Sequence, residues 1–328
     1  MYNEQEKSIM KVIVEKYPVQ LDSIRKITNE MYQLTGDQHE YFARITNYRS
    51  FEEQLEEIKL LSYLSAHGVG VPSVVPSKGG KMVEKAEFPT EQYIVLFRKA
   101  NGIHLPRSRW DCDVFLELGR EIGKLHRFTS AYECHNKVDY LIDWHESEEY
   151  SFLKYIPEEE TTIREISRKI LSEIHQIPKN RDNYGLLHGD IWLENVLVTD
   201  SSDITIIDFQ DCEKHFYIYD LVVPIYSALE FSYAGNGNIK EYGQSIAKSM
   251  FKGYLEENRL PVEMIEKLPL FFKLKELFEY NLMHMYWNME SLAEEQVRIL
   301  NHYRIRLESN YPVISLDPRD LMNLDGVK

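Results

Sequence analysis

Apolar residues in the first fifty positions recur at helical spacing and then at strand spacing. Residues 1–17 place apolar side chains three or four positions apart among acids and lysines and end before a proline, which predicts a packing helix. Residues 21–46 follow the shorter period of strands, and the turn residues Gly36 and Asp37 divide them into a hairpin.

A capping box of Ser50 and Glu53 begins the next predicted helix, which ends near His67. The apolar face of this helix consists of Phe51, Leu55, Ile58, Leu61 and Leu64. Glu57 lies at the border of that face, where a carboxylate is costly unless it has a partner. We therefore expect Glu57 to be paired, with Glu53 or Glu56 in its place if the helix is rotated.

The rest of the pattern is mostly helical. Residues 92–97 predict a strand that is broken by residues 98–102, and a helix with a regular apolar face begins at Asp111. Residues 131–185 are polar and acidic around a helical stretch at 163–177, which we interpret as a variable insertion or a solvated helix pair. The later predicted helices are 221–233, 242–255, a short turn after residue 261, 269–291 and 293–311.

Candidate chemistry gathers in residues 187–221, LHGDIWLENVLVTDSSDITIIDFQDCEKHFYIYDL. Two short apolar runs flank the polar turn at residues 200–203, so this part of the stretch predicts a β-hairpin. A hairpin brings its two ends together, and we expect Asn195 and Asp208 to lie side by side there. Asp190 is on the loop just before them.

These three side chains fit phosphoryl transfer. Mg²⁺ dehydrates reluctantly and is held by one or two protein oxygens together with nucleotide phosphates, and an amide and a carboxylate supply such oxygens. The reaction also needs an acceptor for the proton of the attacking hydroxyl, which is the role of the aspartate in the kinase loop H-R-D-x-x-x-x-N. Here the loop reads H-G-D-x-x-x-x-N.

With its hairpin and closing I-D-F, this stretch resembles the aminoglycoside phosphotransferase and choline kinase-like family, which shares its fold with protein kinases. The resemblance implies that Asp190 is the catalytic base and that Asn195 and Asp208 bind Mg²⁺. It also implies that Asp220, in the tripeptide YDL, is a structural acid beneath the loop.

The same resemblance implies nucleotide-binding residues near the N-terminus. Arg44 occupies the strand position where the family commonly has a lysine that pairs with phosphates, and Glu57 would be its partner. Arginine keeps the charge but is longer and planar, so it is not equivalent to lysine. Asn29 lies in the hairpin that covers the nucleotide in this family, in a chain with no glycine-rich phosphate loop there. An exposed arginine and an ordinary turn asparagine are the alternatives.

The composition of the chain favours some classes of binding partner and disfavours others. Lys and Arg total 38 against 53 Asp and Glu, a net charge of −15, which disfavours nucleic acid and would attract a cationic substrate, or simply keeps the protein soluble. The chain has no apolar run of membrane-spanning length, and because the residues MYNEQEKS lack the basic start and apolar run of a signal peptide, we expect none. Three cysteines without a C-x-x-C pair favour thiols in a cytoplasmic enzyme.

The predicted fold is therefore α+β and protein-kinase-like, with two lobes. Residues 1–98 would form a small, β-rich nucleotide-binding lobe, and residues 99–328 a larger, mostly helical catalytic and substrate-binding lobe. The implied function is an ATP- and Mg²⁺-dependent phosphotransferase acting on a hydroxyl of a small molecule, such as an aminoglycoside, an amino alcohol or a hydroxy amino acid. A protein Ser/Thr kinase and a catalytically silent nucleotide-binding protein are the alternatives.

Two further features are open to a functional and a structural interpretation. Residues 268–294 interleave aromatic side chains with glutamates, and Asp211 and Glu213 follow the predicted metal ligand, which together would suit a substrate ammonium. The alternative is that most of these aromatics are core, because they recur at helical spacing. His126 has no partner nearby in the sequence that would complete a catalytic triad, so we expect a packed or capping histidine.

Overall fold

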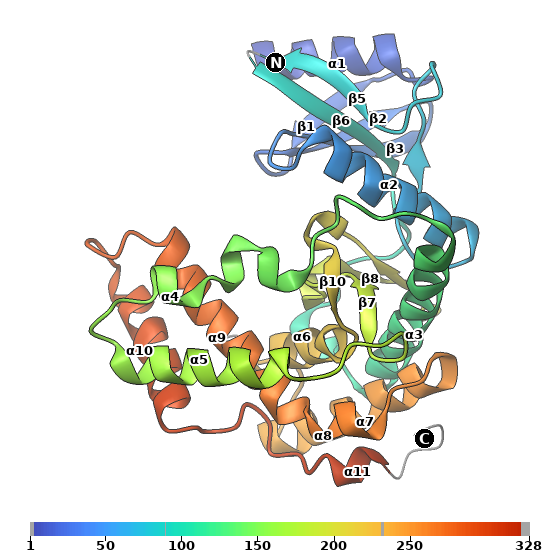
Figure 1. The fold of residues 1–328 in the computed structure, drawn as a ribbon. Coiled ribbons are helices and arrows are strands. Elements are labelled where there is room, and N and C mark those ends of the chain that lie inside the picture. The colour runs from blue at the N-terminus through green and yellow to red at the C-terminus, as the bar shows by residue number, and fades with distance from the viewer. Residues whose placement is uncertain (1–2, 89, 231–232, 323–328) are drawn as a thin grey trace. The chain divides into compact units, whose positions relative to one another are not determined.

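The computed structural model describes residues 3–88, 90–230 and 233–322, which fold into two compact units (Figure 1). Unit 1 comprises Met1–His104, Ala131–Leu141 and Glu194–Cys212. Unit 2 comprises Leu105–Ser130, Ile142–Leu193 and Glu213–Lys328. The chain therefore passes between the units several times, and the predicted lobes 1–98 and 99–328 stay a prediction.

Unit 1 is built on an antiparallel sheet with the strand order β1-β2-β3-β6-β4, and β5 also pairs with β6. The strands are β1 (Ser23–Lys26), β2 (Met31–Gly36), β3 (His39–Thr46), β4 (Val74–Val75), β5 (Glu84–Phe88) and β6 (Thr90–Arg98). Sequence reasoning missed β4 and β5. It also treated β1 and β2 as one strand, whereas Thr28 Oγ1 accepts the backbone N–H groups of Glu30 and Met31 and makes a turn between them.

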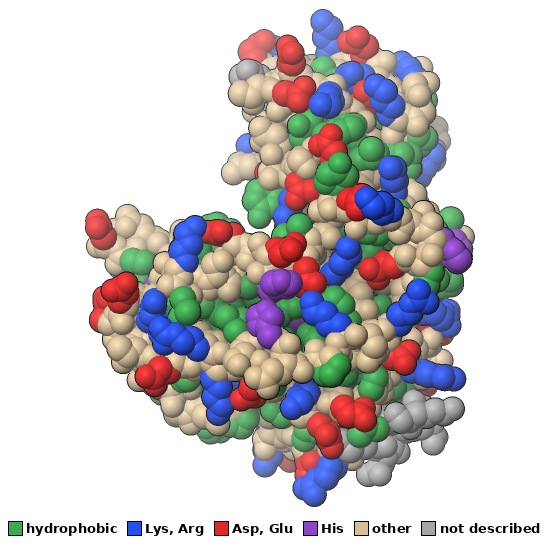
Figure 2. Space-filling view, in the orientation of Figure 1, with side chains coloured by type: hydrophobic (Ala, Val, Ile, Leu, Met, Phe, Trp, Pro, Cys, Tyr) green, Lys and Arg blue, Asp and Glu red, His purple; other side chains and the backbone are tan. Residues whose placement is uncertain are grey.

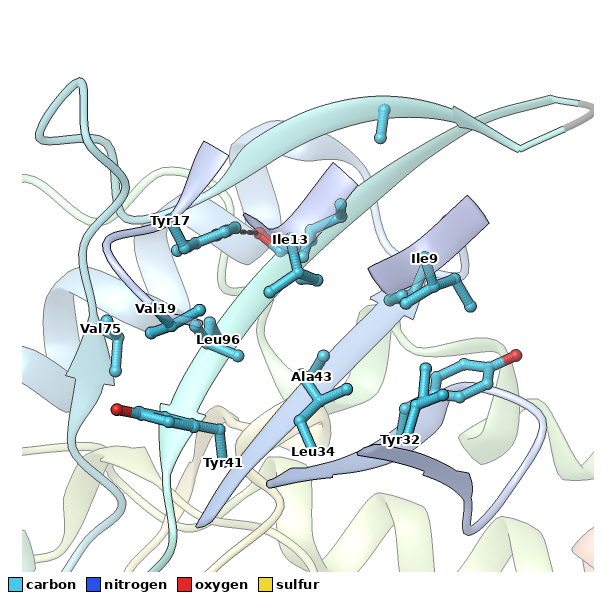
Figure 3. Close-up of a cluster of buried hydrophobic side chains, with 14 of the residues drawn as sticks. Ile9, Ile13, Tyr17, Val19, Tyr32, Leu34, Tyr41, Ala43, Val75 and Leu96 are labelled. Atoms are coloured by element: carbon cyan, nitrogen blue, oxygen red, sulfur yellow. Dashed lines mark hydrogen bonds between the residues drawn. The ribbon is translucent and has the colours of Figure 1, made fainter. Parts of the chain in front are cut away.

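The predicted N-terminal helix is present as α1 (Glu4–Lys16) and covers the core of the sheet (Figure 3). Ile9 and Ile13 point from the helix into this core, and the Tyr17 hydroxyl donates a hydrogen bond to the carbonyl oxygen of Ile94 at 3.0 Å. Asn3 and Glu6 form a capping box at the start of the helix. The apolar face of α1 thus buries one side of the sheet.

Backbone pairing explains why the hairpin of residues 194–212 belongs to unit 1. Ile103 and Val198 exchange two backbone hydrogen bonds of 3.0 Å, and Ile206 N–H donates to the carbonyl of Gly70. Gly102, with φ +98°, lies so close to this strand that a Cβ would come within 2.8 Å of the Val198 backbone. Only glycine accepts that conformation and that approach without strain.

Unit 2 is mostly helical and surrounds α6 (Ile218–Leu229), in which every residue from Ile218 to Ala228 is buried. Its other α-helices include α4 (Phe152–Tyr155), α5 (Thr161–His175), α7 (Ile239–Glu257), α8 (Val262–Glu266), α9 (Leu268–Tyr286), α10 (Glu294–Glu308) and α11 (Arg319–Met322), and its paired strands are β7 (Tyr184–Leu187) and β10 (Glu213–Phe216). Helix α3 (Cys112–His135) begins in unit 2, and its last turn belongs to unit 1.

The segment 142–185 differs from the sequence prediction. Trp144, Tyr150 and Phe152 are buried, and the Trp144 ring stacks on His215 with 4.7 Å between ring centroids. The segment is therefore part of the core of unit 2, so the interpretation of residues 131–185 as a solvated helix pair was wrong for this part, and the alternative of a variable insertion stays a prediction. Aromatic residues spaced along a polar stretch bury their rings while the intervening acids stay in water.

The surface carries both charge signs. Acidic and basic side chains are interspersed over the face seen in Figure 2. Within the described residues, no helix has the length and apolar character that crossing a bilayer would require. Cys112, Cys134 and Cys212 are thiols, as we expected from a sequence without a C-x-x-C pair.

Candidate active site

The H-G-D loop follows strand β7 in unit 2, and Asp220 holds it from below. Asp220 is buried in the first turn of α6, and its two carboxylate oxygens accept the backbone N–H groups of His188 and Gly189, each at 2.9 Å. Gly189 has φ +83°, a conformation that a larger residue would adopt only with strain. The acid implied beneath the loop is therefore found there, and it fixes the backbone on which Asp190 follows.

His126 reinforces this support. Its Nε2 lies 3.0 Å from an Asp220 oxygen, its Nδ1 lies 3.1 Å from the Tyr254 hydroxyl, and its ring stacks on Tyr217. The ring is buried and hydrogen-bonded at both nitrogens. The expectation of a packed histidine is confirmed. Its hydrogen bond to Asp220 helps to hold the acid that supports the loop.

A buried lysine stands next to Asp190, and sequence reasoning missed it. Lys275 of α9 is 1% exposed, and its Nζ lies 2.7 Å from a Glu279 oxygen and 3.9 Å from Asp190 Oδ1. The ring centroids of Trp192 and Phe278 lie 5.0 and 4.8 Å from the same nitrogen. The sequence signal was a lysine within the apolar run of a helix, four positions before a glutamate.

This lysine keeps its charge. Burial alone would lower the pKa of Lys275, but the carboxylate of Glu279, followed by Tyr219 and Asp190, raises it. Burying an ammonium is costly unless it is paired, and here carboxylates and two aromatic faces offset the lost hydration. Asp190 consequently has a permanent positive charge as its neighbour.

The structure favours the core interpretation for most of the α9 aromatics. Phe271, Phe272 and Tyr280 are buried, and Glu276, also buried, pairs with Arg306 at 2.7 Å. The protein's own Lys275 thus occupies the aromatic and acidic setting that the sequence suggested for a substrate ammonium.

The two acids that follow Asp208 also have partners within the protein. Asp211 lies 3.8 Å from Arg49, and Glu213 accepts a hydrogen bond of 3.3 Å from the Tyr150 hydroxyl. Each contact lies within one unit. These acids therefore contribute to local structure as well as to the negative charge of the chain.

In unit 1, the predicted hairpin is present as β8 (Val196–Val198) and β9 (Ile204–Ile206). Val196 pairs with Ile206, and the next backbone bond runs from Ile207 N–H to the carbonyl of Asn195 at 2.9 Å. Asn195 and Asp208 therefore lie at the same end of the hairpin, as the pattern predicted. Asp208 has φ +65°, a left-handed conformation that turns the chain out of the strand direction.

The expected ion pair between Arg44 and Glu57 is also present in unit 1. The two terminal nitrogens of Arg44 donate to the two oxygens of Glu57 at 2.8 and 2.7 Å, and the residues are 2% and 4% exposed. Glu57 is therefore the partner, rather than Glu53 or Glu56. The alternative of an exposed strand arginine is excluded by the burial.

Glu57 does not use all the hydrogen-bond donors of Arg44. Burial would lower the pKa of its guanidinium, but Glu57 and then the more distant Asp208 and Glu30 raise it, so the charge persists. A guanidinium has five N–H donors, and Glu57 accepts two of these. Its Nε is buried and has no hydrogen-bond partner among the residues that the structure describes. A forked cation with remaining donors suits phosphate oxygens.

Asn29 is exposed in the turn between β1 and β2. The side chain that organises this turn is Thr28, through its two accepted hydrogen bonds, rather than Asn29. The nucleotide-binding role of Asn29 stays a prediction.

The two predicted metal ligands have the chemistry that a hard cation requires. Among the described residues, no three His, Cys, Asp or Glu side chains form a cluster that could hold a metal ion by themselves. Asn195 and Asp208 offer one amide and one carboxylate oxygen, which suits Mg²⁺ with phosphates completing its shell better than it suits a protein-only cage. Arg44, Glu57, Asn195 and Asp208 all belong to unit 1, whereas Asp190, Asp220 and Lys275 belong to unit 2.

Known proteins share this architecture. The chain is 27% identical over 319 residues to an amicoumacin kinase of Bacillus subtilis (strain 168), covering 95% of each protein. A solved amicoumacin kinase in complex with AMP-PNP, Ca²⁺ and Ami has a TM-score of 0.87 at 26% identity, over 98% of this chain and 97% of that one. A microcompartment-associated aminopropanol kinase has a TM-score of 0.72 at 22% identity, over 92% and 95%.

These likenesses confirm the predicted α+β, protein-kinase-like fold class. The family described as "Phosphotransferase enzyme family" matches residues 24–236, which is more than half of the 328 residues. The chain therefore belongs to the phosphotransferase enzyme family.

Proposed function

We propose that this phosphotransferase moves the γ-phosphoryl group of ATP to a hydroxyl of a small molecule, with Mg²⁺ as the metal. The observation that carries the proposal is the buried Arg44–Glu57 pair in the same unit as the hairpin end with Asn195 and Asp208. A charged fork with unused donors and two oxygen ligands is a suitable set for a metal-bound triphosphate.

Each residue has a distinct part. Arg44 would contact phosphate oxygens while Glu57 fixes its orientation, and Asn195 and Asp208 would hold the metal through their oxygens. The metal, when bound, neutralises charge that develops on the transferring phosphoryl group. Asn29 would lie over the nucleotide. The lobe division at residues 98 and 99 is part of the same proposal, with nucleotide binding assigned to the N-terminal lobe.

Asp190 would orient the acceptor hydroxyl and take its proton. The support for this role is the fixed loop, in which Asp220 engages the two preceding backbone amides. A carboxylate held in this way contributes by position first and by basicity second. The ammonium of Lys275 lies 3.9 Å from Asp190 Oδ1, so it attracts this carboxylate and helps to hold it in place.

The acceptor is expected to be a small amine-bearing alcohol. The net charge of −15 favours a cation, and amicoumacin leads the list of compounds to test because the relative matched over 95% of the chain is named for it. Aminoglycosides, amino alcohols and hydroxy amino acids follow. A cationic acceptor should show a KM that rises with ionic strength, and a neutral sugar of similar size should be a poor acceptor.

One experiment separates this function from its alternatives. The protein is incubated with ATP, Mg²⁺ and a panel of amicoumacin, hydroxylated amines, sugars, amino acids and a generic protein substrate, and products are identified by mass. A phosphorylated small molecule supports the proposal. Phosphate on the protein substrate alone supports a protein kinase, and nucleotide binding without any product supports a silent nucleotide-binding protein.

Cytoplasmic location is proposed from the three thiols.

A further inference from the structure

Two adjacent glutamates on helix α2 (Phe51–Ala66) have different partners. Glu57 pairs with Arg44, as described above. Glu56 accepts three consecutive backbone N–H groups: its Oε1 lies 3.0 Å from Asp139 N, and its Oε2 lies 2.6 and 2.8 Å from Tyr140 N and Leu141 N. One carboxylate therefore satisfies three amides of a segment without helix or strand.

The three bonds share one carboxylate acceptor, and two of them lie at the surface. Hydrogen bonds to an ionised acceptor are shorter and roughly twice as strong as those between neutral groups. The amides belong to residues that follow the end of α3 at His135, where the chain has left the helix and supplies no carbonyl partner of its own. Glu56 thus holds this segment in one conformation while the segment holds Glu56.

A second contact joins the same two parts of unit 1. Tyr63, two turns further along α2, packs its ring on Tyr132 with 5.0 Å between centroids. Helix α2 is therefore attached at two points, Glu56 and Tyr63, to Ala131–Leu141. Two separated attachments restrict rotation of a helix about its axis as well as its displacement.

The contact of Glu57 with Arg44 depends on how α2 is rotated about its axis. Successive residues of an α-helix point about 100° apart, so a small turn of α2 would move the Glu57 carboxylate away from Arg44. The capping box of Ser50 and Glu53 determines where the helix begins but does not fix its rotation against the sheet. The buried apolar stripe limits rotation only within a broad arc.

We propose that Glu56 is a positioning residue for the Arg44–Glu57 pair, acting by clamping α2 to the backbone of residues 139–141. The inference rests on the proposed function, in which that pair orients the phosphates of ATP. Glu56 makes no contact with substrate in this role, and its effect on the reaction passes through Glu57.

The first test compares Glu56→Gln with Glu53→Gln, the same substitution three residues earlier on the same helix. Glutamine at position 56 keeps the size but loses the charge, and its amide can turn an N–H group toward the donors. We expect the KM for ATP to rise by about tenfold, with kcat and the acceptor KM changed less than about twofold. Glu53→Gln keeps an acceptor for the Ser50 N–H and should leave both thermal stability and the ATP KM near wild type.

The second test is a cycle with Glu57→Gln. If Glu56 acts through Glu57, the double variant should have the ATP KM of Glu57→Gln alone, within about twofold. Multiplication of the two single effects would overturn the proposal, and so would a wild-type ATP KM in Glu56→Gln. Should Glu56→Gln not fold, Glu56→Asp replaces it in the cycle, with a smaller effect in the same direction.

The outcome for the ion pair itself is distinguishable. If Glu57→Gln and Arg44→Ala both leave the ATP KM unchanged, the proposed role of the pair in nucleotide binding is wrong. If they raise it while Glu56→Gln does not, only the clamp is wrong. Amide hydrogen exchange at residues 139–141 adds a direct measurement, because loss of the clamp should speed exchange there and wild-type exchange in Glu56→Gln would contradict it.

Discussion

Each unit buries a cation with carboxylates, and the two groups are built differently. In unit 1, the planar fork of Arg44 meets both oxygens of Glu57, so one cation and one acid neutralise each other. In unit 2, the ammonium of Lys275 bonds Glu279 and stands 3.9 Å from Asp190, under two aromatic rings. The first group is a one-to-one pair that leaves guanidinium donors unused, whereas the second connects a supporting acid to the predicted base.

The difference follows from the two side chains. A guanidinium has fixed donors that match a carboxylate in two places, so its geometry is decided by one partner. An ammonium is a point charge that can serve two carboxylates at once. We therefore expect unit 1 residues to govern nucleotide and metal binding, and unit 2 residues to govern turnover.

The largest expected effect is in unit 2. Asp190→Asn should keep the shape of the loop and remove the proton acceptor, so kcat should fall by on the order of 10²- to 10⁴-fold. Nucleotide affinity, measured by titration with a fluorescent ATP analogue, should stay near wild type. Wild-type turnover would remove Asp190 from the role of base, and a parallel loss of ATP affinity would break the proposed separation between the units.

The next prediction tests how strongly Arg44 and Glu57 are coupled in stability. Arg44→Ala and Glu57→Ala should each lower the free energy of unfolding by about 3–5 kcal/mol, because each leaves a buried charge without its partner. The double variant should cost much less than the sum. Urea unfolding measures all three, with Lys7→Ala at the exposed Lys7–Glu4 pair as a control of small effect. Additive losses would show that the pair is not energetically coupled.

A third comparison concerns the metal. Asp208→Ala and Asn195→Ala should weaken Mg²⁺-dependent nucleotide binding by about ten- to hundredfold, and excess Mg²⁺ should restore part of it because an oxygen ligand is missing. Activity is measured across a magnesium series. As a control, the activity of Asp190→Asn should depend on magnesium concentration as wild type does. If magnesium concentration had no effect on the activity of Asp208→Ala and Asn195→Ala, the ion would be held elsewhere.

The smallest expected effect tests whether Lys275 contributes to turnover through Asp190. Lys275→Met keeps a side chain of similar length but removes the positive charge between the carboxylates of Asp190 and Glu279. We expect kcat to fall by roughly tenfold with ATP affinity unchanged. Glu279→Gln leaves the ammonium beside Asp190 and should lower kcat less. Equal loss in both variants, or a loss confined to stability, would mean that Lys275 serves only to pack α9.

Much of this arrangement could be predicted from the sequence. The hairpin that aligns Asn195 with Asp208 is encoded by two apolar runs around a polar turn, and the position of Glu57 at the edge of a helical stripe predicted that it needs a partner, which the family resemblance implied to be Arg44. These features depend on the period of neighbouring side chains, which local geometry fixes. The resemblance carried by the H-G-D loop supplied the implied roles.

The tertiary structure decided what periodicity could not. Glu56 meets amides 83 to 85 positions away, and Lys275 reaches Asp190 from a helix that on its pattern alone is core. A buried charge looks the same in a sequence whether its partner is near or distant, because pairing across elements depends on how they pack rather than on spacing. The sequence by itself therefore determined the elements and the loop with its candidate base and metal ligands. Packing decided which charges support them, since a carboxylate or ammonium is stable in the interior only where a partner from another segment meets it.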